Sequence, residues 1–165
     1  MNNSTIFKNI TVVTPDNNEI KVFKNYFVAV HKNLISYVGP ENIDALNSLP
    51  ENESVYYYDG KGRILLPSFV NAHTHLAMTL MRNHADDTVL HDWLFKMIFP
   101  VEAKLRPKDI NNGNLLGIIE MIKSGTGACA NMYMNYEEFM DAKLALDTGI
   151  KLNTVINGGY SDIKS

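Results

Sequence analysis

The sequence has a single cysteine, no long apolar run and no cluster of basic residues. Cys129 alone cannot form an intramolecular disulfide, which fits a reducing compartment, and it is expected to be a small buried side chain. No apolar run approaches the roughly 20 residues that cross a bilayer. The first ten residues, MNNSTIFKNI, lack the basic and apolar regions of a signal peptide. We therefore expect a cytoplasmic protein without a membrane partner.

Charge also excludes a class of partner. The formal net charge is −3, and acidic and basic residues are mixed along the chain. Because no basic stripe is present, nucleic acid is not expected as a partner. An apolar content of 45% and a charged content of 20% are ordinary for a globular protein. The 165 residues suffice for one hydrophobic core.

The first third of the chain is rich in β-forming residues separated by turn signals. The pattern predicts a three-stranded meander, then a short helical turn near residues 43–49 and a further strand. The predicted strands are Ile6 to Thr14, Glu19 to His31, Leu34 to Val38 and Val55 to Tyr58.

From Ile64 onward, strand and helix patterns alternate, which predicts a parallel sheet with right-handed crossovers. Ile64 to Ala72 is expected to be a buried strand. The other predicted strands are Thr126 to Met132 and Ile150 to Ile156. The predicted helices span residues 76–82, 90–99 (ended by Pro100), 107–123 and 136–147.

A His-x-His pair follows the first of these strands. Side chains alternate along a strand, so His73 and His75 should point the same way and Thr74 the other. Two neutral imidazoles on one face are suitable ligands for zinc, iron or another divalent transition metal. The pair alone is a weak signal, and two structural histidines remain the alternative.

Three segments together carry a family resemblance. They are Pro67 to Leu76 (PSFVNAHTHL), Trp93-Leu94 and Pro100 to Leu105 (PVEAKL). With them, the chain from about Ile6 to Ile156 resembles the amidohydrolase superfamily. Within that superfamily it is most similar to the 5'-methylthioadenosine/S-adenosylhomocysteine deaminases and related chlorohydrolases.

The resemblance implies a fold, a metal and a reaction. The fold would be α/β, an incomplete (β/α)8 TIM-type barrel preceded by part of a small β-sandwich, because a whole barrel needs about 250 residues. We therefore expect a fragment, with the sandwich in residues 1–63 and the barrel in residues 64–165. His73 and His75 would be metal ligands, most simply for zinc, and in such enzymes a metal-activated hydroxide displaces ammonia from a purine.

The resemblance assigns Glu102 to substrate binding, as a carboxylate that accepts hydrogen bonds from the sugar hydroxyls of an adenosine-type substrate. A surface glutamate is the alternative. Two positions depart from the family pattern, which has aspartate where Asn131 stands and often arginine where Asn157 stands. These departures weaken the assignment of this particular substrate.

Other polar and aromatic residues give weaker signals. His31 is expected to face solvent, and His84 and His91 flank the Asp86-Asp87 loop, which is expected to cap the next helix. Trp93 is compatible with a lid over the substrate and with an anchor for its helix.

Three functions follow as competing predictions. The first is metal-dependent hydrolytic deamination of a purine nucleoside such as methylthioadenosine or S-adenosylhomocysteine, by a complete enzyme of which this chain is an inactive part. The second is a chlorohydrolase or a guanine/cytosine-type aminohydrolase. The third is a non-catalytic remnant whose unpaired sheet edge favours a homo-oligomer. The expected partner in the first two cases is a small-molecule substrate.

Overall fold

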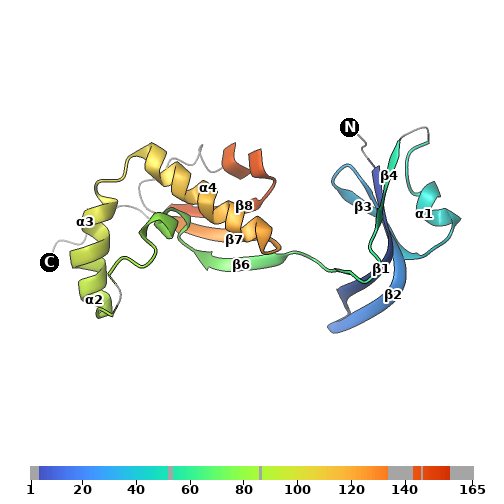
Figure 1. Ribbon diagram of the computed structural model, residues 1–165, viewed down its shortest axis with the longest axis horizontal. Coiled ribbons are helices and arrows are strands. Elements are labelled where there is room, and N and C mark those ends of the chain that lie inside the picture. Colours follow the sequence, from blue (N-terminus) through green and yellow to red (C-terminus); the bar gives the residue numbers. More distant parts are fainter. Residues whose placement is uncertain (1–3, 52–53, 86, 134–142, 146, 157–165) are drawn as a thin grey trace. The chain divides into compact units, whose positions relative to one another are not determined.

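The computed structural model describes residues 4–51, 54–85, 87–133, 143–145 and 147–156. The chain forms two compact units, Met1–Pro67 and Ser68–Ser165, each with its own sheet (Figure 1). The fold is therefore mixed α/β. Among the described residues, no helix is both long and apolar enough to cross a membrane.

In its described part, the first unit contains one five-stranded sheet and a short helix. Four strands have the order β3-β2-β1-β4, and β5 also pairs with β1. The pairs β1–β2 and β2–β3 are antiparallel, whereas β4 and β5 run parallel to β1. The strands are β1 (Ser4–Asp16), β2 (Glu19–His31), β3 (Leu34–Pro40), β4 (Val55–Asp59) and β5 (Ile64–Leu65). The predicted meander, the fourth strand and the short helix α1 (Ile43–Asn47) are confirmed.

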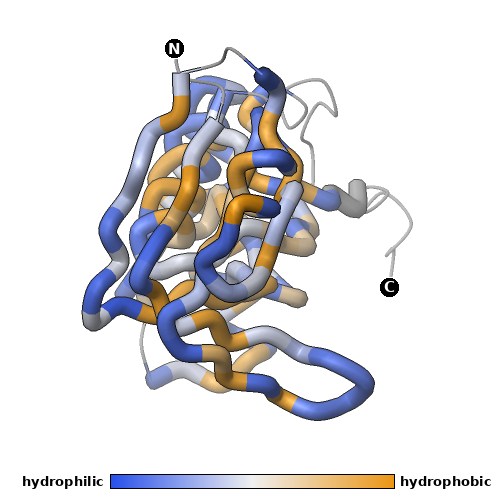
Figure 2. Tube along the Cα trace, turned by 90° about the vertical axis from the view of Figure 1, so that its right-hand side faces the viewer, coloured by the Kyte–Doolittle hydropathy of each residue, from blue (hydrophilic) through white to orange (hydrophobic). Residues whose placement is uncertain are grey.

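Turn chemistry explains both hairpins of this sheet. Asn17 and Asn18 have φ of 49° and 67°, the left-handed conformation that a tight hairpin turn needs and that asparagine tolerates. Lys32 takes φ of 53° in the second hairpin. Along the tube in Figure 2, hydrophilic stretches lie both in turns and within strands, between hydrophobic stretches. This unit has two buried clusters, one of Ile6, Phe27, Ala29, Ala45 and Leu49 and a second of Ile10, Val12 and Val28.

The segment from Ile64 to Ala72 differs from the prediction of one buried strand. It contains β5, which pairs with β1 of the first unit, and the beginning of β6 (Phe69–Thr74), which belongs to the second. Pro67 lies between them and has no N–H to donate, which explains the break. Among the described residues β6 is an edge strand that pairs with β7, and its residues Phe69 and Val70 are exposed.

The second unit contains a parallel sheet, as predicted. Its strand order is β6-β7-β8, with β7 (Thr126–Tyr133) in the centre and β8 (Lys151–Ile156) at the other edge. The helix α4 (Pro107–Lys123) connects β6 to β7 and packs against β7 and the 3₁₀ helix η1 (Leu76–Met81) (Figure 1). Most of the predicted helix over residues 136–147 lies outside the described residues.

One continuous helical segment precedes α4. It consists of α2 (Leu90–Asp92), the π-helical η2 (Trp93–Ile98) and α3 (Phe99–Glu102). Pro100 does not end this segment, contrary to prediction, because it lies in the first turn of α3, where a missing N–H is tolerated. The predicted aspartate cap is also wrong for Asp87, because Val89 occupies the N-cap of α2 without a side-chain hydrogen bond.

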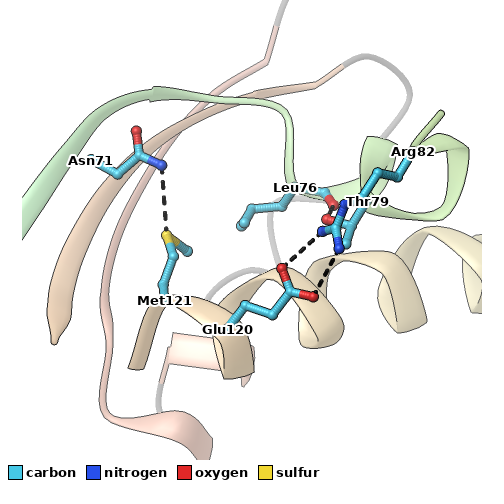
Figure 3. A network of polar contacts seen from close by, with 6 residues as sticks. All are labelled: Asn71, Leu76, Thr79, Arg82, Glu120 and Met121. Carbon is cyan, nitrogen blue, oxygen red and sulfur yellow. Dashed lines mark hydrogen bonds and ion pairs between the residues drawn. The ribbon is translucent and has the colours of Figure 1, made fainter. Parts of the chain in front are cut away.

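Helix α4 lies very close to η1. A Cβ atom on Gly113 would come within 2.6 Å of the Ala77 carbonyl oxygen, so only glycine fits this contact. At the surface, Arg82 forms a bidentate pair with Glu120 of α4, with N–O distances of 3.1 and 2.8 Å (Figure 3). These contacts fix the segment that directly follows the histidine pair.

Candidate functional site

The two histidines lie next to each other at the end of β6. The ring centroids of His73 and His75 are 4.9 Å apart, and the rings meet edge to face at 88°. His73 is exposed and His75 is half-buried. The two imidazoles therefore lie in one place, as the sequence predicted, although His75 follows the last residue of β6.

A backbone carbonyl of the next strand fixes the ring of His75. The His75 Nδ1 atom lies 2.6 Å from the Met132 carbonyl oxygen of β7. A carbonyl can only accept, so Nδ1 carries the proton and donates it. In the neutral imidazole, Nε2 then keeps its lone pair. Metal-ligating histidines commonly use this arrangement, because a carbonyl bonded to one ring nitrogen sets the orientation of the other.

Two asparagines hold the backbone on either side of the pair. The Asn71 Oδ1 accepts from the His73 N–H at 3.3 Å, and its Nδ2 donates to the Met121 sulfur at 3.8 Å (Figure 3). The Asn131 Oδ1 accepts from the Leu76 N–H at 3.0 Å. Asn131, which stands where the family pattern has aspartate, therefore makes a hydrogen bond to the backbone.

Glu102, the predicted substrate-binding residue, is the last residue of α3 and is half-buried near the pair. Burial raises the pKa of its carboxyl group, and the nearby Tyr133 hydroxyl and His75 ring lower that pKa to a smaller extent. Burial and the Glu102 carboxylate together raise the pKa of Tyr133. The buried Tyr133 hydroxyl has no well-aligned hydrogen-bond partner among the described residues. Glu102, Tyr133 and His75 thus form one polar group.

The remaining histidines lie elsewhere. His31 is half-buried in the first unit, 3.0 Å from the Ser4 hydroxyl, so the expectation of a solvent-facing ring is wrong. His84 and His91 are exposed, and His91 pairs with the adjacent Asp92 at 3.4 Å. Within the described part of the chain, no group of three or more His, Cys, Asp or Glu residues is placed to hold a metal.

The sequence did not reveal the contributions of Tyr133 and of the Met132 carbonyl. Both lie on β7 about 57 residues after the histidine pair, and backbone carbonyls carry no sequence signal. The one signal in the sequence was the predicted strand that became β7. Because parallel neighbouring strands have their carboxyl ends at the same edge of a sheet, residues at the end of β7 could be expected near the histidine pair. Asn157 lies outside the described residues.

The donor set fits part of a metal site. Two imidazoles supply two of the three or more protein ligands that a stable zinc site usually has. Both rings lie at the carboxyl end of a parallel strand, where barrel enzymes place their functional groups. The hydrogen bond at Nδ1 leaves Nε2 of His75 available.

Comparison with known proteins identifies the family. Residues 64–157 match the model of the Amidohydrolase family. The chain is 40% identical over 148 residues to 5-methylthioadenosine/S-adenosylhomocysteine deaminase of Acetivibrio thermocellus. This alignment covers 90% of this chain and 33% of the relative. The chain therefore spans about a third of the length of this curated relative.

Two solved structures share the fold. The atrazine chlorohydrolase of Arthrobacter aurescens, solved with zinc, aligns with a TM-score of 0.77 at 20% identity, over 98% of this chain and 38% of that one. The guanine deaminase of C. acetobutylicum, solved with guanine, aligns with a TM-score of 0.71 at 21% identity, over 92% of this chain and 36% of that one. Since the family model covers more than half of the residues, this chain belongs to the amidohydrolase family.

Proposed function

We propose that this chain supplies part of the active site of a metal-dependent hydrolytic deaminase that acts on a purine nucleoside such as methylthioadenosine or S-adenosylhomocysteine. The observation that carries the proposal is the adjacency of His73 and His75, with their rings 4.9 Å apart, beside the half-buried Glu102. The relative at 40% identity, which is named for this activity, supports the substrate class.

His73 and His75 are the residues that would hold the metal. Imidazole nitrogens suit zinc, and the zinc-containing chlorohydrolase structure favours zinc over iron or another divalent ion. A zinc ion bound there would act as a Lewis acid that lowers the pKa of water toward neutrality. The Met132 carbonyl holds the His75 ring in the tautomer that such binding requires.

Glu102 would bind the sugar. An ionised carboxylate has two acceptor oxygens and can accept hydrogen bonds from both vicinal hydroxyls of a ribose. Partial burial strengthens such contacts, because fewer water molecules compete for the same oxygens. The carboxylate would therefore orient the nucleoside toward the histidine pair.

The finer architecture is part of the same proposal. The strands β6, β7 and β8 would be the first strands of a (β/α)8 barrel, and the sheet of residues 4–65 would be part of a β-sandwich. Parallel order, crossover helices and a site at the carboxyl end of a strand all suit a barrel. The solved neighbours with TM-scores of 0.71 and 0.77 support the placement.

One sequence feature favours a second candidate. Asn157 stands where relatives of the deaminase type often carry an arginine, so a chlorohydrolase or a guanine/cytosine-type aminohydrolase is the alternative. The complete gene product, loaded with zinc, should release ammonia from methylthioadenosine, S-adenosylhomocysteine or adenosine. Turnover of only guanine, cytosine or a chlorinated triazine would establish the alternative, and no turnover of any of them would contradict both.

The metal site is tested on the 165-residue chain itself. We expect His73→Ala and His75→Ala each to weaken zinc binding at least about tenfold in isothermal titration, because each removes one ligand. His84→Ala is the matched control, since His84 is exposed and belongs to the same unit. Equal zinc affinity in all three variants would refute the assigned site.

We expect the chain alone to bind zinc weakly and to turn over no substrate, since its described residues supply two ligands.

A further inference from the structure

We infer that Asn131 is a positioning residue for the metal site, whose side-chain oxygen holds the backbone after His75 so that the ring keeps its place on the Met132 carbonyl. The inference rests on the proposed metal-binding role of His75. It concerns a residue of β7 that would touch neither metal nor substrate.

Asn131 is built into the second unit as a buried polar group. Its side chain is 1% exposed, and in the sheet it lies opposite Thr74, the residue between the two histidines. Burying an amide is unfavourable unless it finds hydrogen-bond partners. A buried asparagine at this position therefore calls for a specific contact.

That contact is made to the residue after His75. The Asn131 Oδ1 accepts from the Leu76 N–H at 3.0 Å, and Leu76 is the first residue of η1. The first N–H groups of a helix have no partner within the helix, so the asparagine satisfies one of them. A backbone N–H can only donate, which places Oδ1, rather than Nδ2, at this contact.

The next residue of the same strand holds the ring. The Met132 carbonyl accepts from His75 Nδ1 at 2.6 Å. Two consecutive residues of β7 therefore fix His75 twice, once through the backbone that follows it and once through its imidazole. His75 itself has φ −127° and ψ 79°, outside regular helix and strand, and as the N-cap of η1 its carbonyl accepts from the Met78 N–H at 2.9 Å.

The chemistry of the contact requires an acceptor. The Asn131 Nδ2 has no hydrogen-bond partner among the described residues, so the donor half of the amide is not used there. An aspartate would keep the acceptor, whereas a leucine of similar size would remove it. Comparing these two substitutions separates the hydrogen bond from the packing.

The test measures zinc affinity and the tautomer of His75 in the 165-residue chain. We expect Asn131→Leu to weaken zinc binding about tenfold or more, the usual range for losing an outer partner of a ligand, and Asn131→Asp to retain most of the affinity. In the metal-free wild type, ¹⁵N NMR should show the Nδ1–H tautomer of His75, and Asn131→Leu should mix it with the Nε2–H form.

Ile118→Val is the structural control, because it trims a fully buried side chain of the same core and removes no hydrogen-bonding group. It should lower thermal stability without changing zinc affinity or the tautomer. Equal affinity in Asn131→Leu and wild type, equal losses in the Asp and Leu variants, or a similar loss in Ile118→Val would each overturn the inference. So would a predominant Nε2–H tautomer in the wild type, a result that does not depend on any variant folding.

The His75→Ala result separates the two proposals. If His75→Ala leaves zinc binding unchanged, the proposed metal site itself fails. If His75→Ala abolishes binding while Asn131→Leu does not weaken it, only the positioning role fails.

Discussion

At the scale of single residues, Glu102 is assigned to substrate binding, and keeping its carboxyl group ionised in the folded chain costs stability. Its carboxyl group is half-buried, and burial is the largest influence on its pKa, which is raised. An acid whose pKa is higher in the folded than in the unfolded chain takes up protons on folding. Stability should therefore fall as the pH rises from the unfolded pKa, about 4.3, through the higher folded value.

Glu102→Gln should remove this dependence. We expect the variant to melt at a higher temperature than the wild type at pH 7 in the presence of a chelator, with the difference becoming small near pH 4, where most of the wild-type carboxyl is protonated in both states. Calorimetric melts between pH 4 and pH 8 measure the difference in melting temperature between the variant and the wild type. Glu120→Gln provides the contrast, because its salt bridge with Arg82 lowers the pKa and the same substitution should not stabilise the chain. A constant difference across the pH range would contradict the prediction.

At the same scale, the sequence revealed the ligand types but not what orients them. His73 and His75 could be paired from strand alternation alone, and the rings do lie together. The role of Asn131 could not be read, because its partner is a backbone N–H 55 residues away. In the sequence, Asn131 stood out only because the family pattern has aspartate at that position.

At the scale of elements, the contact between α4 and η1 depends on the absence of side chains. A Cβ atom on Gly113 would lie 2.6 Å from the Ala77 oxygen and 3.0 Å from its Cα, both backbone atoms that cannot rotate away. In an isolated helix, alanine is more favourable than glycine by about 1 kcal/mol. A net loss of stability on adding one methyl group therefore has to come from this contact.

We predict that Gly113→Ala destabilises the second unit by about 1–3 kcal/mol, the usual cost of overpacking. Asn112→Ala is the control, since the neighbouring position is exposed on the same helix, and its effect should stay within about 0.5 kcal/mol. Urea titrations followed by circular dichroism measure both. A Gly113→Ala variant as stable as the wild type would show that η1 moves away from α4 at no cost.

Element boundaries show where local rules failed. Pro100 was expected to end its helix, but it lies in the first turn of α3 directly after the π-helical η2. Proline is tolerated there because the N–H groups of a first turn have no carbonyl partner in the same helix. The sequence showed the proline but not the change of hydrogen-bond register before it.

At the scale of the whole molecule, the second unit leaves apolar surface uncovered. Four residues of α4 are exposed by 36% to 47%, namely Leu115, Leu116, Ile119 and Ile122. Phe69 and Val70 of the edge strand β6 are exposed as well. Exposed apolar side chains and a strand edge that is open among the described residues favour association, so the homo-oligomer stays a prediction.

We predict concentration-dependent self-association of the chain, measured by size-exclusion chromatography with light scattering. The double variant Ile119→Lys and Ile122→Lys should shift the population toward monomer, because it places two charges on the apolar face. Asn112→Lys adds a charge at an exposed position of the same helix and should change the population less. A monomeric wild type at all concentrations would contradict the prediction.

The sequence by itself determined the elements and the family. Period-two and helical patterns, turn residues such as Asn17 and Asn18, and the His-x-His segment are local signals, so the strands, the hairpins and the parallel sheet could be predicted. Only the tertiary structure decided that Ile64–Leu65 joins the first sheet, that the Met132 carbonyl meets His75, and that Glu102 lies near Tyr133 and His75. The physical reason is that such contacts join residues distant in sequence. They depend on the packing of α4 and η1 against β7, which no local pattern encodes.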